Sequence, residues 1–173
     1  MKKRLYAVLW AAFLLIGVAA VAYAIHEEKP AETTVPLPTA DAAKLYAYIT
    51  KDNPYDKWEL WPGKGRFYKG REPHGSFLST YVNNHAYFSA RDKKGKMADS
   101  SIIVKENYTS QKKMAALTVM YKINGYNPSA GDWFWAKYEP YGKMLASGKV
   151  EACISCHGSN KTNDFIMTEK IGK

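Results

Sequence analysis

The sequence predicts an α+β fold, mainly an antiparallel β-sheet with a few short helices. From residue 58 onward, short runs rich in β-branched and aromatic residues alternate with Gly-rich or polar turns. No long stretch shows the 3.6-residue apolar period that a helix bundle would need. The helical patterns that do occur are short, so helices are expected to cover the sheet rather than to build the core.

The N-terminus has the pattern of an export signal. Lys2, Lys3 and Arg4 precede an uncharged apolar run over residues 5–25, and Ala22-Tyr23-Ala24 supplies the small-x-small sequence of a signal-peptidase site. The run is also long enough to span a bilayer. Residues 1–25 are therefore a cleaved signal peptide or a retained membrane anchor. Either one delivers the rest of the chain outside the cytoplasm, so we expect a periplasmic or otherwise extracytoplasmic protein.

A linker and a single domain follow. Residues 26–38 are rich in Pro, Thr and charge without an apolar period, which is typical of a tether. Residues 39–173 form one domain, large enough to bury a core. Its first helix is expected to begin at Thr39 or Asp41, both good N-caps, and to continue to about Thr50 before Asp52-Asn53-Pro54.

The remaining elements follow from turn signals and alternation. A turn is expected at residues 61–65, a short helix at 83–90, and a helix at 148–157 that carries the only two cysteines. Extended segments are expected at residues 77–82, 101–108, 115–122, 132–138 and 164–168. Their spacing indicates an antiparallel meander.

The chain is moderately basic. Its formal charge is +9, of which Lys2, Lys3 and Arg4 contribute three, so a chain without residues 1–24 would carry +6. This charge would suit docking to an acidic redox partner or an anionic membrane face. The short lysine clusters at residues 93–96 and 112–113 lie in expected turns, which favours ordinary solubilising charge. Nucleic-acid binding does not fit an exported chain.

The main functional signal is Cys153-Ile154-Ser155-Cys156-His157. C-x-x-C-H is the attachment sequence for c-type haem, in which two thiols form thioethers and the histidine ligates iron. We therefore predict one covalent haem c, held by Cys153 and Cys156, with His157 as axial ligand. A zinc site would have to recruit His74 or His85 from far away, and a dithiol redox site would follow a βαβ pattern that is missing. A disulfide between the two cysteines remains an alternative.

Several short motifs resemble the cytochrome P-460 family. They are Trp58…Trp61-Pro62-Gly63, Pro73-His74-Gly75, Tyr81-Val82-Asn83, Ile103-Val104-Lys105-Glu106-Asn107-Tyr108, Thr118-Val119-Met120-Tyr121-Lys122, Gly125-Tyr126-Asn127-Pro128, Gly131-Asp132-Trp133-Phe134-Trp135 and C-x-x-C-H. The resemblance implies a mainly β monohaem c-type protein, often dimeric, with an open or loosely occupied distal site. The family includes enzymes that handle hydroxylamine or nitric oxide and whose haem carries a lysine cross-link. It also includes gas-binding relatives of the cytochrome c-prime-beta type, which do not have the cross-link. Lys105 matches the cross-linking lysine.

Alternation leaves two positions open for Lys105. If Ile103 faces the core, Lys105 shares that face, and a partly desolvated amine would be nucleophilic enough to bond a porphyrin. If Ile102 and Val104 face inward instead, Lys105 points to water. Glu106 lies on the opposite face from Lys105 and is expected to be solvated.

The distal side of the haem is less defined. His74, in a Pro-His-Gly turn, is a weak distal candidate, as a hydrogen-bonding group or proton relay. His85 is weaker, and His26 lies in the tether. A thioether ligand would come from Met97, Met114, Met120, Met144 or Met167, and a distal acid from Asp132 or Glu139. The aromatic residues Trp133, Phe134, Trp135 and Tyr138 are expected to line the core and the haem edge.

Three functions fit these features. The first is binding of nitric oxide or hydroxylamine at a five-coordinate iron, with or without oxidation of the ligand, and with electrons passing to a soluble redox partner. The second is a nitric-oxide-binding protein without turnover, so the sequence leaves open whether the protein is an enzyme. The third is a simple electron-transfer cytochrome with both axial positions filled. A homodimer and a membrane contact through residues 5–25 alone are further expectations.

Overall fold

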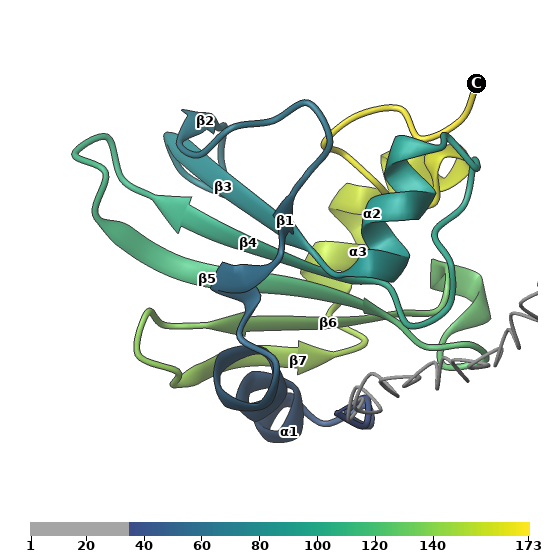
Figure 1. Ribbon diagram of the computed structural model, residues 1–173, viewed down its shortest axis with the longest axis horizontal. Helices are drawn as coiled ribbons and strands as arrows, with labels where there is room; N and C mark the ends of the chain where they lie inside the picture. Colours follow the sequence, from purple (N-terminus) through teal and green to yellow (C-terminus); the bar gives the residue numbers. More distant parts are fainter. Residues whose placement is uncertain (1–34) are drawn as a thin grey trace, which may run out of the picture. The chain divides into compact units, whose positions relative to one another are not determined.

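The computed structural model describes residues 35–173, and the N-terminal signal or anchor and most of the tether lie outside them. This part of the chain forms a seven-stranded antiparallel sheet with short helices (Figure 1). The predicted mainly antiparallel α+β fold is confirmed. Among the described residues, no helix is long and apolar enough to cross a bilayer.

The sheet has the order β1-β3-β4-β5-β6-β7, and β2 pairs with the other end of β3. From β3 to β7 each strand lies beside its predecessor, apart from the helix inserted after β3, as expected for a meander. The strands are β1 (Glu59–Leu60), β2 (Tyr68–Lys69), β3 (Phe77–Val82), β4 (Ile102–Tyr108), β5 (Met114–Lys122), β6 (Trp133–Tyr138) and β7 (Met144–Gly148).

The helices are short and well capped. Asp41 accepts a hydrogen bond from the Lys44 amide at the start of α1, and Asn83 does the same for Ala86 at the start of α2. The helical elements are α1 (Ala42–Ala47), η1 (Tyr48–Asp52), η2 (Tyr55–Lys57), α2 (Asn84–Arg91), η3 (Pro128–Ala130), α3 (Glu151–His157) and η4 (Gly158–Asn163).

Both faces of the sheet are buried. Along β4, Ile102 and Val104 pack with α1, whereas Ile103 packs with α2, α3 and the C-terminal segment. Phe134 and Trp135 divide in the same way on β6. Successive side chains of a strand point to opposite faces, so one strand can supply two cores. The second core, beside α3, positions the site.

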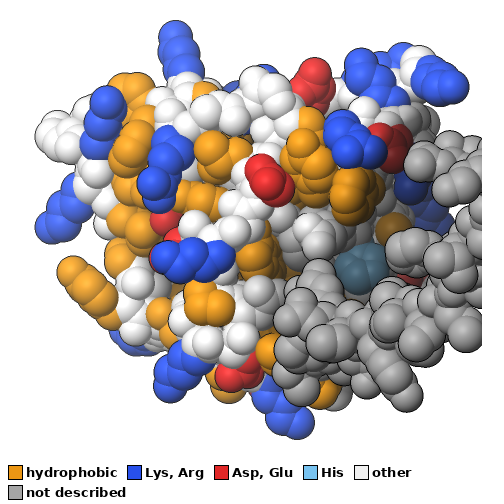
Figure 2. Space-filling view, viewed as in Figure 1, with side chains coloured by type: hydrophobic (Ala, Val, Ile, Leu, Met, Phe, Trp, Pro, Cys, Tyr) orange, Lys and Arg blue, Asp and Glu red, His pale blue; other side chains and the backbone are white. Residues whose placement is uncertain are grey.

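Charged side chains surround this apolar interior. Figure 2 shows Lys and Arg side chains distributed over the visible face and its rim rather than gathered at one place. This distribution agrees with the solubilising role expected from the short lysine clusters.

Candidate haem site

The C-x-x-C-H sequence lies on α3, as predicted. Cys153 is partly buried and Cys156 is exposed, and both thiols are free. His157, at the last position of the helix, turns inward and is only 6% exposed. The helix therefore presents two free thiols beside a buried imidazole.

One nitrogen of His157 is fixed by the backbone. Its Nδ1 lies 2.7 Å from the carbonyl oxygen of Phe165. A carbonyl can only accept, so Nδ1 carries the proton and donates, and Nε2 keeps its lone pair. Burial lowers the pKa of His157, and the Phe165 bond opposes that shift only in part. The imidazole is thus held in the neutral form that ligates a metal, in the manner usual for metal-bound histidines.

The segment that supplies this carbonyl is not a strand, so the prediction for residues 164–168 is wrong. Asp164 and Phe165 both have left-handed backbone conformations, with φ of 53° and 65°. Asp164 is held there by several bonds: its carboxylate accepts from Lys122 and from the Met97 amide, and its carbonyl accepts from the Trp133 indole. These tertiary bonds override the β-branched and aromatic composition that suggested a strand.

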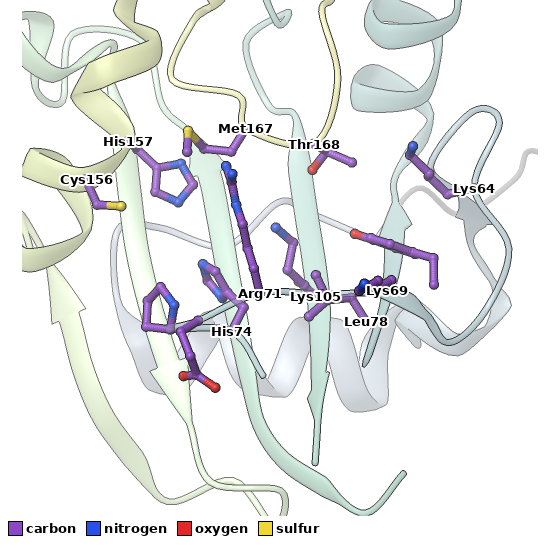
Figure 3. Close-up of a pocket in the computed structure, with 14 residues that line it drawn as sticks. Lys64, Lys69, Arg71, His74, Leu78, Lys105, Cys156, His157, Met167 and Thr168 are labelled. Atoms are coloured by element: carbon purple, nitrogen blue, oxygen red, sulfur yellow. The ribbon is translucent and has the colours of Figure 1, made fainter. Parts of the chain in front are cut away.

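Two cavities, of about 640 and 710 Å³, share lining residues beside His157. Figure 3 shows the residues that line the first of them. Their shared lining consists of Glu72, Pro73, His74, Lys105, Cys156 and His157. The first cavity extends towards the cations Lys64, Lys69 and Arg71. The second extends past Cys153 towards apolar side chains, which include Ile103, Met120, Trp135 and Val150.

This arrangement fits a haem. A porphyrin has an apolar body, two vinyl groups that react with thiols, and two carboxylates at its opposite edge. The apolar cavity with Cys153 suits the first two features, and the cationic cavity suits the carboxylates. His157 Nε2 supplies the metal ligand where the cavities meet. Trp135 packs against this imidazole, with ring centres 4.7 Å apart. Of the aromatic run it alone lines a cavity, because Trp133 lies in the second core and Phe134 and Tyr138 lie in the core on the other face of the sheet.

Lys105 faces this site. It lies on β4 opposite Thr80 of β3 and Thr118 of β5, and its side chain lines both cavities. Burial, and then repulsion from Arg71, lower the pKa of its amine to about 8. Ile102 and Val104 do face a core, as the water-facing alternative required, but the second face of the sheet is covered as well. Lys105 therefore lies in the cavity wall instead of pointing to bulk water.

His74 lies across the cavities from His157. It belongs to the loop between β2 and β3, and its Nδ1 lies 2.8 Å from the Asn107 side-chain oxygen. The two imidazole centres are 6.2 Å apart, with ring planes at 88°. Burial, together with repulsion from Lys105, lowers the pKa of His74 to about 4. In contrast, His85 is exposed on α2 and lines neither cavity, and His26 lies outside the described residues.

The five methionines considered as thioether ligands differ in whether they line the cavities. Met120 lines the apolar cavity and Met167 the cationic one. Met97 is buried in the second core, and neither Met114 nor Met144 lines either cavity. Only two of the five thioethers are thus near the site.

Neither acid expected near the site is found there. Asp132 accepts a hydrogen bond from the Asn127 amide, and Glu139 pairs with Lys143 on an exposed turn. Both belong to turns at the ends of β6, so their proximity to the aromatic run in sequence was misleading. The carboxylate that does line both cavities is Glu72, which the sequence analysis missed although it lies two residues before His74.

The expectation that Glu106 is solvated is also wrong. It is 5% exposed and accepts hydrogen bonds from Tyr55 at 3.0 Å and Tyr108 at 2.7 Å. The opposite face of β4 is covered by η2, which brings Tyr55 to the carboxylate. A buried carboxylate needs such partners.

Asn107 and Arg71 were missed as well. Asn107 follows Lys105 by two residues, so strand alternation could have placed it on the same face. Arg71 gave no signal, because its place at the cavity depends on the path of the β2–β3 loop.

Comparison with known protein families gives one match. The family described as Cytochrome P460 matches residues 54–168, more than half of the chain. No curated protein matches the chain.

Proposed function

Given that the chain belongs to the cytochrome P460 family and is therefore a haem-binding cytochrome, we propose that it carries one covalent haem c that binds nitric oxide or hydroxylamine. Cys153 and Cys156 would form the thioethers, and His157 would be the proximal ligand. The observation that carries the proposal is the fixed His157 imidazole, whose free Nε2 lies where two cavities of matching chemistry meet.

Haem iron, when bound, supplies a coordination site and one-electron redox chemistry. The chain determines how that chemistry is used. The Phe165 carbonyl keeps the proton on His157 Nδ1 and so orients the ligand nitrogen. Ile103, Met120 and Trp135 exclude water from one side of the site, which favours small uncharged ligands.

Lys105 bears on whether the protein is an enzyme. Its amine lines both cavities and has a lowered pKa, so a substantial neutral fraction is available near pH 8. This is the property that a covalent bond to the macrocycle requires. We propose Lys105 as the cross-linking residue if the protein oxidises hydroxylamine. A protein that only binds nitric oxide would leave this amine free.

Spectroscopy tests these alternatives directly. Absorption spectra of the ferric and ferrous holoprotein are compared with those of the same sample after unfolding. A ferrous Soret band that is strongly red-shifted and stays abnormal after unfolding indicates a modified macrocycle, and the shift should disappear in Lys105→Met. Turnover with hydroxylamine and an artificial electron acceptor then separates the oxidoreductase from the binding protein. A holoprotein that binds neither nitric oxide nor hydroxylamine in any variant would overturn the proposal.

A second candidate function is simple electron transfer, with both axial positions filled. The observation in its favour is His74, which faces His157 at a separation of 6.2 Å. Ligand binding separates this candidate from the first, because an electron carrier keeps both histidines on the iron when nitric oxide or hydroxylamine is added, whereas the first function requires a coordination site that these ligands can occupy.

We also propose a cellular location and partners for the protein. Thioether attachment of haem and the N-terminal pattern both suit a periplasmic or other extracytoplasmic location. Electrons would pass to a soluble redox partner, and a homodimer is compatible with the family resemblance. Residues 5–25, if retained, would be the membrane contact.

A further inference from the structure

His74 and His157 enter the site from different parts of the fold. His157 ends α3, whereas His74 belongs to the exposed loop before β3. Figure 3 shows the two imidazoles on opposite sides of the pocket with their rings directed towards one another. The cavities meet between them, since both residues line both cavities.

The two imidazoles are fixed in the same way. The Asn107 amide nitrogen donates to the carbonyls of Lys105 and Ala116 and to the Thr118 hydroxyl. The Asn107 oxygen is therefore the group that faces His74 Nδ1, and it can only accept. His74 Nδ1 must carry the proton, so Nε2 is left with its lone pair. A second hydrogen bond that fixes the other nitrogen is the usual environment of a metal-bound histidine, and here both histidines have one.

The distance between the rings is the distance that one shared metal requires. A metal–imidazole bond of about 2 Å, with roughly 1 Å from nitrogen to ring centre, puts two such centres about 6 Å apart. The observed separation is 6.2 Å. A water or a substrate placed between His74 and a ligated iron would require a wider gap. The angle of 88° between the ring planes is compatible with two imidazoles on one axis, each standing upright on the macrocycle.

We propose that His74 is a second axial ligand, whose Nε2 binds the haem iron opposite His157 in the resting protein and must leave before a nitrogen ligand can bind. This rests on the haem site of the proposed function and adds what controls access to it. The exchange replaces one lone-pair donor by another, so it requires no source of protons or electrons.

The structure also indicates which histidine leaves. His157 is 6% exposed and lies on a helix packed into the second core. His74 is carried by a short loop in which Arg71, Glu72 and Pro73 are exposed. Moving this loop exposes little apolar surface, so its local opening costs less than opening of α3.

Spin state tests the ligation. Electron paramagnetic resonance spectra of the ferric holoprotein, and absorption spectra of its ferric and ferrous forms, are recorded for wild type, for His74→Ala, and for the control His85→Ala, which changes an exposed histidine outside the cavities. We expect low-spin spectra for wild type and His85→Ala. His74→Ala should lose the low-spin signal, and added imidazole should restore it. A high-spin wild type, or a His74→Ala protein that stays low-spin, would overturn the proposal.

Carbon monoxide tests the displacement. With ferrous wild type, the observed binding rate should reach a plateau as carbon monoxide concentration rises, because loss of His74 becomes limiting. With His74→Ala it should rise linearly. A linear dependence in both would show that His74 does not have to leave. If His74→Ala fails to fold, His74→Gln replaces it in both measurements, because its amide keeps much of the side-chain volume but is not a strong-field ligand. Nitric oxide binding by His74→Ala tests the proposed function separately, since it does not depend on whether His74 is a ligand.

Discussion

The Lys122 ammonium lies 2.6 Å from a carboxylate oxygen of Asp164, and both side chains are almost completely buried. The same carboxylate accepts a hydrogen bond from the Met97 amide. The next residue, Phe165, offers its carbonyl to His157. The ion pair therefore fixes the backbone that orients the proximal ligand, although neither charged group touches the cavities.

Removing one member of this pair should be costly. Lys122→Met leaves the Asp164 carboxylate buried without its cation, and we expect the free energy of unfolding to fall by about 3–5 kcal/mol. Urea unfolding of the holoprotein measures this. Lys143→Met is the matched control, because Lys143 forms an exposed pair with Glu139 and should cost no more than about 1 kcal/mol. Equal stability of the two variants would show that the buried pair does not stabilise the loop.

Gly131→Ala should destabilise the same loop from the other side. Gly131 has φ of 68°, and an added Cβ would lie 2.8 Å from the Phe165 ring. We expect about 1–2 kcal/mol from the left-handed backbone and a further ~1–3 kcal/mol from the clash. Gly125→Ala is the control, since Gly125 has φ of 75° but open space around it. Thermal unfolding of both variants isolates the Phe165 contact, and identical losses would contradict it.

The tyrosines around Glu106 predict an alkaline transition. Burial, together with the Glu106 carboxylate, raises the pKa of Tyr55 and of Tyr108 well above their usual value of 10.0. Because these tyrosines ionise at a higher pH in the folded state than in the unfolded state, their contribution to stability is fully present below pH 10. It is lost as the pH rises further and the tyrosines of the unfolded state ionise. Unfolding free energy should fall above pH 10, less steeply in Tyr55→Phe. Tyr141→Phe, which changes a tyrosine that is 97% exposed, should behave as wild type.

The cysteines predict stepwise loss of covalent haem. Cys153→Ser and Cys156→Ser, each made in a Lys105→Met background that excludes a lysine cross-link, should each retain haem through one thioether, and the variant that lacks both cysteines should retain none. The intact mass under denaturing conditions measures this, with Ser155→Ala as a control on the same helix. A variant that lacks both cysteines and Lys105, but whose mass still includes haem, would contradict attachment through these thiols.

Much of the fold was predictable because its signals are local. Alternation located β3, β4, β5 and β6, and Asp41 and Asn83 marked the starts of α1 and α2. Residues 164–168 show where prediction from local sequence fails. Their composition favours a strand, but the bonds to Asp164 come from Lys122, Met97 and Trp133, which are distant in sequence.

Two charged residues of β4 show the same limit. Alternation correctly separated Lys105 from Glu106, but it could not tell what covers each face. The structure shows that α3 and the β2–β3 loop bring the cavities to Lys105, and that Tyr55 and Tyr108 enclose Glu106. Burial of a strand residue depends on the second layer, which a strand pattern does not specify.

The sequence by itself determined the attachment chemistry, because Cys153, Cys156 and His157 are neighbours on one helix and their relative positions follow from helix geometry. Only the tertiary structure decided which side chain lies opposite His157. His74 meets His157 through the packing of the β2–β3 loop, β4 and α3, and its free Nε2 depends on a bond to Asn107. Distances within one helix are set by covalent geometry, whereas distances between separate elements are set by how the whole core packs.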